Sequence, residues 1–352
     1  MRFFRPAIVA MDGYTPGFQP KTSDVIKLNT NENPYPASPR VTEAIQHRLE
    51  QGLQRYPSPM ADAFRAAAAA LHGVTPDWVL AGNGSDDILT ICTRAFIGEG
   101  QVIRTPTPSY VLYKTLAEIQ GGRIELIPFQ RDWSLGDDFV EDVDDNLKLA
   151  IIANPNSPSG TMLSPERVLK LATRLPCPLL VDEAYVDFAD QSCLDLIHED
   201  QRIMISRTLS KSYALAGLRF GYVIAQPHMI RELAKVKDSY NCDALSIAGA
   251  TAAIEDQDWL AENRAKILAG RERLTDGMRR IGFTVADSQA NFTWNTHVDW
   301  PIKVIAESLI ARGIFVRYMK YEGWADGLRI SVGTEAQIET CLEQIAAIVR
   351  AL

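Results

Sequence analysis

Short apolar runs alternate with amphipathic segments through most of the chain. Buried strands are predicted for the runs rich in Val, Ile and Leu at residues 77–84, 101–105, 123–129, 147–155, 178–185, 202–208 and 220–226. Helices are predicted where apolar residues recur three and four positions apart, at residues 41–50, 61–73, 85–98, 109–121 and 164–175. Strands that alternate with helices indicate an α/β fold whose mostly parallel sheet is covered on both faces. Since ligands bind at the carboxyl ends of such strands, the loops that follow them are where chemistry is expected.

The pattern divides the chain into three parts. Residues 1–40 are rich in Pro, Asn and Gly and lack periodicity, which predicts an N-terminal arm. Residues 41–245 carry the alternating strands and helices of a large domain. From residue 246 a long helical stretch leads into short strands and a last helix, which predicts a small α+β domain over 246–352.

Composition excludes several classes of protein. The 352 residues contain 36 basic and 44 acidic side chains, a net charge of −8, with 46% hydrophobic residues. These values are typical of a globular chain and too apolar for a disordered one. No run approaches the roughly 18 apolar residues of a membrane span. The acidic balance, with no long Lys/Arg cluster, argues against nucleic acid as the main partner, so any bound anion must be held by a few local cations.

Cysteine and histidine spacing points to a reduced protein without a metal. The five cysteines are odd in number, widely spaced and free of any C-x-x-C pair, which fits free thiols in the cytoplasm. His198-Glu199 is not followed by the second histidine of an H-E-x-x-H zinc motif, and no metal site is predicted. The N-terminus has a basic start but only a short apolar stretch, so an arm is favoured over a signal peptide.

Polar residues stand at the ends of the predicted strands in a definite order. Asn154 comes first, then Asp182 with Tyr185, then Ser210-Lys211. Arg219 follows eight residues after Lys211. Any one of these residues alone is more often a cap or a solvated side chain. Their joint order is what points to a site.

This order resembles the fold-type I, pyridoxal phosphate (PLP) dependent aminotransferases. SKSYALAGLRFGY (210–222) is similar to the family's Schiff-base lysine segment, and DEAY (182–185) to the segment that holds the pyridine ring. NPNSPSG (154–160) is similar to the family's N-P-N-x-P-x-G loop, with Ser where Asn is common and Ser where Thr is common. The resemblance implies a large PLP-binding domain with a mostly parallel central sheet and a small C-terminal α+β domain.

The resemblance also assigns roles around the cofactor ring. Lys211 would hold PLP covalently and act as the proton-shuttling base. Asp182 would pair with the pyridine nitrogen, while Tyr185 and Asn154 would donate to the phenolic oxygen. Tyr110, in TPSYVLY, aligns with the aromatic residue that stacks on the ring, although an aromatic after a turn is otherwise most often core.

The cofactor phosphate needs a local anion site. By the same resemblance Ser210 and Arg219 would supply a hydroxyl and a cation. The turn Gly84-Ser85-Asp86 opens a helix, whose N-terminal N–H groups and dipole favour a phosphate. Without the resemblance, this GNGSDD segment would be only a weak glycine turn.

The first 60 residues narrow the resemblance to the histidinol-phosphate aminotransferase subfamily. Three segments of this sequence are similar to segments of that subfamily: YTPG (14–17), KLNTNENPYP (27–36) and QRYPSP (54–59). The tyrosine of R-Y-P reaches the PLP phosphate of the neighbouring subunit there, which implies a homodimer with Tyr56 completing the partner's site. The alternative for Tyr56 is a packed loop residue.

Two arginines of the small domain are candidates for substrate binding. Arg329, in GLRISVGT, resembles the family's substrate-anchoring arginine, and Arg317 lies in GIFVRYM. Guanidinium groups bind carboxylate or phosphate bidentately, although a surface salt bridge is an equal alternative for Arg317. Tyr14 and Asn291 are expected to add polar contacts. Trp324 either favours a flat aromatic substrate or simply packs.

The expected reaction is ping-pong transamination through aldimine and ketimine intermediates. L-glutamate and imidazole-acetol phosphate would give 2-oxoglutarate and L-histidinol phosphate, a step of histidine biosynthesis. Relatives with similar motifs act on aromatic amino acids, or resemble threonine-phosphate decarboxylase, and both alternatives stay open. A non-catalytic PLP-binding regulator is a third, disfavoured because no basic helix-turn-helix segment precedes the arm.

Overall fold

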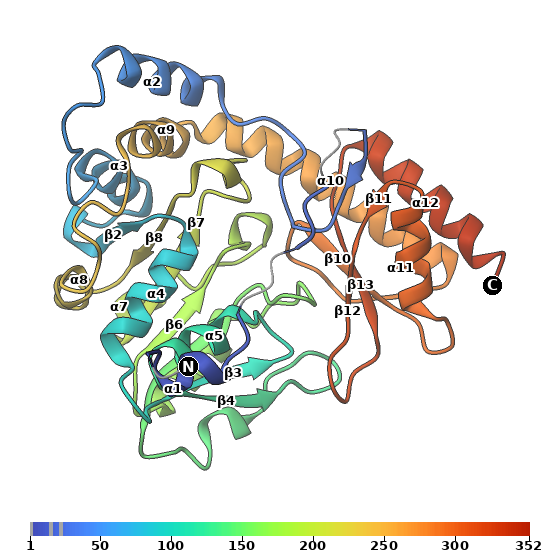
Figure 1. The fold of residues 1–352 in the computed structure, drawn as a ribbon, viewed down its shortest axis with the longest axis horizontal. Coiled ribbons are helices and arrows are strands. Elements are labelled where there is room, and N and C mark those ends of the chain that lie inside the picture. Colours follow the sequence, from blue (N-terminus) through green and yellow to red (C-terminus); the bar gives the residue numbers. More distant parts are fainter. Residues whose placement is uncertain (1–2, 14–16, 21–23) are drawn as a thin grey trace.

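A seven-stranded sheet forms the centre of the larger lobe (Figure 1). The computed structural model describes residues 3–13, 17–20 and 24–352. The strand order is β2-β8-β7-β6-β5-β3-β4, and only β8 runs antiparallel to its neighbours. Its strands are β2 (Val79–Gly82), β3 (Val102–Thr107), β4 (Arg123–Pro128), β5 (Leu147–Ala153), β6 (Leu179–Asp182), β7 (Ile203–Thr208) and β8 (Gly221–Ile224). The predicted, mostly parallel α/β architecture is confirmed.

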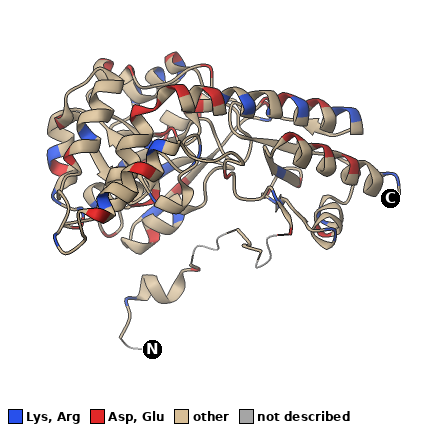
Figure 2. Ribbon diagram, turned by 90° about the horizontal axis from the view of Figure 1, so that it is seen from above, with Lys and Arg blue, Asp and Glu red and all other residues tan. Residues whose placement is uncertain are grey.

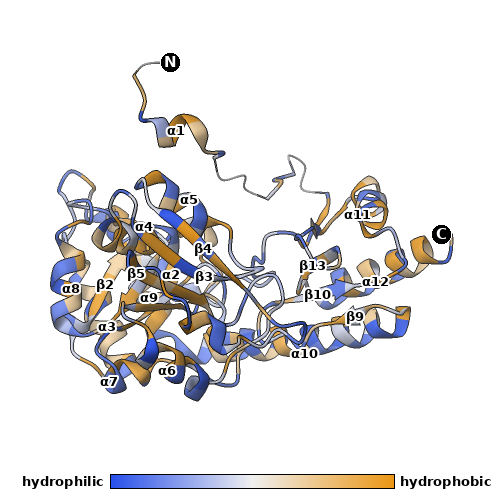
Figure 3. Cartoon of the chain, turned by 90° about the horizontal axis from the view of Figure 1, so that it is seen from below, coloured by the Kyte–Doolittle hydropathy of each residue, from blue (hydrophilic) through white to orange (hydrophobic). Residues whose placement is uncertain are grey.

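Alternate residues of these strands enter two different cores. In β6, Leu179 and Val181 face one core and Leu180 the other. The first core is covered by α3 (Asp62–His72), α6 (Pro165–Arg174), α7 (Leu196–Glu199) and α9 (Ala244–Glu255). The second is covered by α4 (Ser85–Phe96), α5 (Leu112–Ile119) and α8 (Pro227–Ala234). Figure 3 shows the hydrophobic strands enclosed between helices whose outer faces are hydrophilic. Burial on both faces explains why the strands read as continuous apolar runs.

The smaller lobe has its own sheet and core. Its four strands are antiparallel in the order β12-β13-β10-β9. They are β9 (Thr284–Val285), β10 (Phe292–Thr296), β12 (Arg317–Met319) and β13 (Gly327–Ser331), covered by α10 (Gln257–Ile281), α11 (Ile302–Ala311) and α12 (Glu335–Val349). The early segment β1 (Ile26–Lys27) pairs in parallel with β11 (Ile314–Phe315), and Leu28 enters this core. The N-terminal segment is thereby tied to the C-terminal lobe.

The helical stretch predicted over 245–282 is two helices. They meet at Asp256, whose backbone leaves helical geometry and whose carboxylate accepts the Trp259 N–H at the start of α10. α9 packs against α2 (Pro39–Glu50) and α3 in the large lobe, whereas Ile267 and Leu274 of α10 lie in the small-lobe core. The chain therefore passes from one core to the other within α10 (Figure 1).

Local sequence signals set several helix ends. Ser-Pro pairs begin α2 and α6, where Ser38 accepts the Arg40 N–H and Ser164 accepts the Arg167 N–H. At the N-terminus, α1 (Pro6–Ala10) lies near α5, with the Arg5 guanidinium donating to the Ile119 carbonyl. Charges of both signs are mixed along the helices rather than gathered on one face (Figure 2).

None of the described helices is long and apolar enough to cross a membrane.

Candidate active site

A cavity lies between the two lobes, at the carboxyl ends of β5, β6 and β7. These strands are neighbours and parallel, so the residues that follow them converge on one edge of the sheet. Lys211, Asp182 and Tyr185 all line the cavity, as do Arg317 and Arg329 from the small lobe. The sequence placed these groups far apart, and the sheet topology brings them together.

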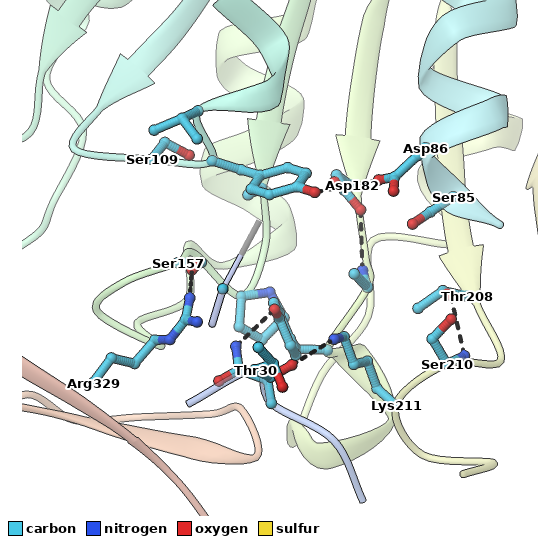
Figure 4. A pocket seen from close by; sticks show the side chains of 18 of the residues that line it. Thr30, Ser85, Asp86, Ser109, Ser157, Asp182, Thr208, Ser210, Lys211 and Arg329 are labelled. Atoms are coloured by element: carbon cyan, nitrogen blue, oxygen red, sulfur yellow. Dashed lines mark hydrogen bonds between the residues drawn. The ribbon is translucent and has the colours of Figure 1, made fainter. Parts of the chain in front are cut away.

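Lys211 projects its amine into the cavity from the loop after β7 (Figure 4). Nζ donates to the Thr30 carbonyl at 3.3 Å and lies 5.8 Å from the centre of the Tyr185 ring. Thr30 follows β1, the strand that pairs with β11 of the small lobe, and it also lines the cavity. The amine therefore lies at the junction of the two lobes, within reach of a ligand in the cavity.

Asp182 is the last residue of β6, and its carboxylate is almost completely buried, with 5% of the residue exposed. Oδ2 accepts a hydrogen bond from the Tyr113 hydroxyl at 2.8 Å. Oδ1 accepts from the Ala184 N–H at 3.2 Å and from the Ser206 hydroxyl at 3.3 Å. Burial raises the pKa of Asp182 to about 6 against the pull of these donors, so a cationic partner in the cavity would favour its ionised form.

Tyr185 is held by contacts from the N-terminal segment and the small lobe. Its hydroxyl accepts from Asn31 Nδ2 at 2.9 Å, and its ring packs edge-on against Phe292 of β10 at 5.0 Å between centroids. The hydroxyl therefore lies at a defined position on the cavity wall, where it is able to donate to an oxygen of a ligand.

The end of the cavity at the start of α4 is suited to an anion. Ser85 and Asp86 begin α4, and their position leaves the first N–H groups of that helix without partners inside it. Ser210 Oγ accepts from Arg219 Nη1 at 3.4 Å, and Arg219 Nη2 lies 3.5 Å from Asp86 Oδ2. A Cβ on Gly84, whose φ is +87°, would lie 2.5 Å from Arg219 Nη2. Glycine is therefore required at residue 84 for the arginine to lie beside the helix start.

The small lobe contributes the two predicted arginines. Arg329 of β13 donates from Nη1 to Ser157 Oγ at 3.0 Å and from Nη2 to the Asn29 carbonyl at 3.2 Å (Figure 4). Arg317 of β12 pairs across the sheet with Arg329, and both line the cavity. Two guanidinium groups on adjacent strands are suited to binding a carboxylate or phosphate.

Two predicted site residues lie elsewhere. The Asn154 side chain is completely buried against its own loop, where Nδ2 donates to the Leu163 carbonyl at 3.0 Å and Oδ1 accepts the Leu163 N–H at 2.8 Å. This bonding directs the amide away from the cavity, and Ser157 of the same loop lines it instead. Asn291 lies behind the wall, donating to the Asn31 carbonyl at 3.0 Å, so it supports the site rather than lining it.

Four further predicted residues need comment. Tyr56 is 80% exposed and stacks on Tyr240 at 4.4 Å, away from the cavity of its own chain. Tyr14 lies outside the described residues. Trp324 stacks on Trp133 of the large lobe at 4.3 Å and does not line the cavity, so it packs. Tyr110 does line the cavity and is in edge contact with Tyr113.

Sequence reasoning missed several residues of the wall. Asn29, Thr30 and Asn31 belong to the recognised KLNTNENPYP segment but were assigned no role, although they line the cavity. Thr208, whose hydroxyl accepts the Ser210 N–H at 3.1 Å, follows the signal of a polar residue at a strand end. Tyr113 had no such signal, because an aromatic in the first turn of a helix reads as core.

The donor set fits pyridoxal phosphate. Among its described lining residues, the cavity has one primary amine, at Lys211, and a buried carboxylate, at Asp182. These two groups match a ligand that carries both a carbonyl group and a ring cation. Its far end combines the start of α4 with Ser210 and Arg219, which suits a phosphate. Among the residues that the structure describes, no cluster of three or more His, Cys, Asp or Glu is arranged to hold a metal ion.

Comparisons with known proteins agree with this geometry. Residues 23–345 match the family described as aminotransferase class I and II. The chain is 53% identical to a histidinol-phosphate aminotransferase of Rhodopirellula baltica over 99% of this chain and 96% of that protein. It is 42% identical to a protein of the same name from Geotalea uraniireducens, covering 98% and 99% of the two chains. The crystal structure of histidinol-phosphate aminotransferase from Sinorhizobium meliloti in complex with pyridoxal-5′-phosphate superposes with a TM-score of 0.92 at 25% identity, covering 100% of this chain and 98% of that one.

Proposed function

Because this chain belongs to the class I and II aminotransferases, we propose that it is a PLP-dependent enzyme that transfers an amino group between glutamate and imidazole-acetol phosphate, forming histidinol phosphate. The observation that carries the substrate assignment is the 53% identity to a histidinol-phosphate aminotransferase over almost the full length of both chains. The reaction would place the protein in histidine biosynthesis.

The charge of the cavity supports these substrates. Glutamate carries a distal carboxylate, and the imidazole substrate carries a distal phosphate. Arg329 and Arg317 lie side by side on β13 and β12 and line the same wall. One pair of guanidinium groups is thus available to both anions, which a reaction in two half-steps with alternating substrates requires.

The bound cofactor would supply an electron-withdrawing ring that spreads the electron pair left at the substrate's α-carbon. The chain's own residues do the rest. When the cofactor is bound, Asp182 would hold a positive charge at its ring nitrogen, and the Tyr185 hydroxyl would donate to its ring oxygen. Ser210, Arg219 and the start of α4 would hold its phosphate. Lys211 Nζ, which lies in the cavity, would move a proton to and from the substrate's α-carbon.

We also propose that the protein acts as a homodimer in which Tyr56 completes the neighbouring site. Tyr56 and Tyr240 form an exposed aromatic pair, with 80% and 46% exposure, beside a groove between α2 and α9. Large exposed aromatic patches mark interaction surfaces. A cytoplasmic location is proposed from the five buried cysteines, all of which are free thiols.

A substrate panel tests the function. Purified protein loaded with PLP is assayed with histidinol phosphate, phenylalanine, tyrosine and threonine phosphate as amino donors and 2-oxoglutarate as acceptor. We expect histidinol phosphate to have the highest kcat/KM, with formation of glutamate. Robust transamination of phenylalanine or tyrosine without histidinol phosphate turnover would assign the protein to the aromatic aminotransferases. Release of carbon dioxide from threonine phosphate would indicate a decarboxylase.

A further inference from the structure

A buried tyrosine of α5 donates a hydrogen bond to the Asp182 carboxylate. Tyr113 lies in the first turn of α5, on the second core of the large sheet, and no part of it is exposed. Its hydroxyl donates to Asp182 Oδ2 at 2.8 Å, the shortest of the three hydrogen bonds to that carboxylate. Its ring is held in edge contact with Tyr110, at 5.5 Å and 89°.

The three hydrogen-bond donors are distributed over the two oxygens of the Asp182 carboxylate. Oδ1 receives the Ala184 N–H from the turn after β6 and the Ser206 hydroxyl from β7. Oδ2 receives only the Tyr113 hydroxyl among the hydrogen bonds of the described residues. An ionised carboxylate has about four acceptor positions, so Oδ2 keeps capacity for one ligand donor while Tyr113 fixes its direction.

Tyr113 is suited to remain a donor. Burial, and next the neighbouring Asp182, raise the pKa of the Tyr113 phenol well above its ordinary value, so the hydroxyl stays protonated at neutral pH. A neutral donor favours the ionised form of the carboxylate, whereas burial opposes it. Tyr113 and Asp182 are therefore both shielded from water, and the Tyr113 hydroxyl is a fixed donor that stabilises the negative charge of Asp182.

We infer that Tyr113 is a positioning residue for the cofactor: its hydroxyl holds Asp182 Oδ2 ionised and aimed at the ring nitrogen of PLP. This inference rests on the part of the proposed function that concerns PLP, and not on the identity of the amino donor. Tyr113 acts through Asp182 and makes the ring-nitrogen contact stronger.

The first experiment measures PLP binding to apoenzyme. Tyr113→Phe removes the hydroxyl and keeps the ring and its packing. The matched control is Tyr222→Phe, since Tyr222 is also buried and its hydroxyl lies 2.8 Å from His72 Nε2, away from the cavity. We expect Tyr113→Phe to weaken PLP binding about tenfold, the effect of losing one hydrogen bond to a charged group, and Tyr222→Phe to leave it unchanged. Both variants should lose similar stability in the apo form.

An analogue separates cofactor positioning from general packing. With a deaza analogue of PLP, in which CH replaces the ring nitrogen, the Asp182 contact is absent. We expect Tyr113→Phe and wild-type apoenzyme to bind this analogue equally. Equal weakening for PLP and the analogue would overturn the inference, because the tyrosine would then act on the shape of the cavity.

The pH dependence gives an independent readout. Asp182 interacts with Tyr113 from α5 and Asp86 from α4, and the other ionisable side chains among the described residues that line the cavity are Lys211, Arg219, Tyr110, Tyr185, Arg317 and Arg329. Only Tyr113 differs between the wild type and Tyr113→Phe, so the difference between their pH profiles reports the effect of the Tyr113 hydroxyl. Protonation of Asp182 at low pH removes the charge that pairs with the ring, and losing the donor favours protonation. We expect the loss of PLP affinity in Tyr113→Phe to begin about one pH unit higher than in wild type.

A second variant keeps the inference testable if Tyr113→Phe does not fold. Ser206→Ala removes the longer bond to Oδ1 and should shift affinity and pH dependence in the same direction by a smaller factor. No shift in Ser206→Ala, or a folded Tyr113→Phe that matches Tyr222→Phe, would overturn the inference. Failure of the histidinol phosphate assay with normal PLP binding would instead reject only the substrate assignment.

Discussion

The hydroxyl of Ser157 accepts a hydrogen bond from Arg329 Nη1 at 3.0 Å, which joins the two lobes across the cavity. Ser157 is 6% exposed and follows β5 of the large sheet, whereas Arg329 lies on β13 of the small one. The second terminal nitrogen of Arg329 donates to the Asn29 carbonyl. The guanidinium is thus oriented from two sides before a substrate arrives, which lowers the entropic cost of binding an anion.

Arg329→Lys tests this orientation. Lysine keeps the charge but not the planar fork, so we expect KM for both glutamate and the phosphate substrate to rise about 10- to 100-fold. Ser157→Ala keeps the Arg329 guanidinium and removes one of the two hydrogen bonds that orient it. The resulting rise in KM should be several-fold smaller than the rise caused by Arg329→Lys. Initial rates with each substrate varied in turn give both constants. An unchanged KM in Arg329→Lys would place the anion site elsewhere.

Gly84→Ala should weaken PLP binding through Arg219. The new Cβ would lie 2.5 Å from Arg219 Nη2, and the guanidinium must move away from Ser210 and the start of α4. We expect about a tenfold loss of PLP affinity, because one charge-assisted contact to phosphate is displaced.

The control for this change is Gly73→Ala. Gly73 also has a positive φ, +67°, but a Cβ there meets nothing within 4 Å. It should cost about 1 kcal/mol of stability, and Gly84→Ala about 1–3 kcal/mol, by thermal unfolding. Only Gly84→Ala should change the PLP titration. An equal effect of both variants on PLP binding would show that backbone strain, and not Arg219, is the cause.

The Asp182 carboxylate should make the apoenzyme less stable at neutral pH than its amide variant. Burial raises the pKa of Asp182 from 3.8 to about 6. An acid with a higher pKa in the folded chain binds its proton more tightly when folded, so its contribution to stability falls as the pH rises from about 4 to about 6. We expect apo Asp182→Asn to be more stable than wild type by up to about 3 kcal/mol at pH 8, with the difference disappearing below about pH 4.

Urea unfolding of both apo proteins across this pH range measures the difference, in which all other titrating groups cancel. The same variant should bind PLP far more weakly, because an amide carries no charge for the ring nitrogen. A stability difference that does not depend on pH would mean that the carboxylate is not held in a desolvated site.

Mixing two variants of low activity tests the contribution of Tyr56 to the neighbouring subunit. Lys211→Ala should abolish turnover and the visible absorbance of lysine-bound PLP, while Tyr56→Ala should weaken phosphate binding at the partner's site. In a mixed dimer, one site would receive an intact Lys211 from one subunit and an intact Tyr56 from the other. Unfolding and refolding an equal mixture should therefore restore about one quarter of the wild-type sites, as random pairing in a twofold dimer requires.

Each variant refolded alone is the control and should stay at its own low rate. If the mixture regains no activity although mixed dimers form, Tyr56 does not serve the partner's cavity. A monomer by light scattering would reject the composite site altogether.

The sequence by itself determined the α/β class, the succession of strands along the chain and the identity of most of the chemistry. Strand periodicity and the position of polar residues after each run were enough to place Asp182, Lys211 and the start of α4 at one edge of the sheet, because parallel strands end together. Helix ends could be predicted from the sequence where a local capping residue sets them, as Gly73 does at the end of α3.

Only the tertiary structure decided which side chains of a loop face the cavity. Asn154 and Ser157 stand three residues apart, and hydrogen bonds to Leu163 turn the first away while Arg329 meets the second. Tyr113 reads as a core aromatic until α5 is packed against β6, when its hydroxyl reaches Asp182. Such orientations depend on long-range hydrogen bonds, whose partners no local sequence pattern specifies.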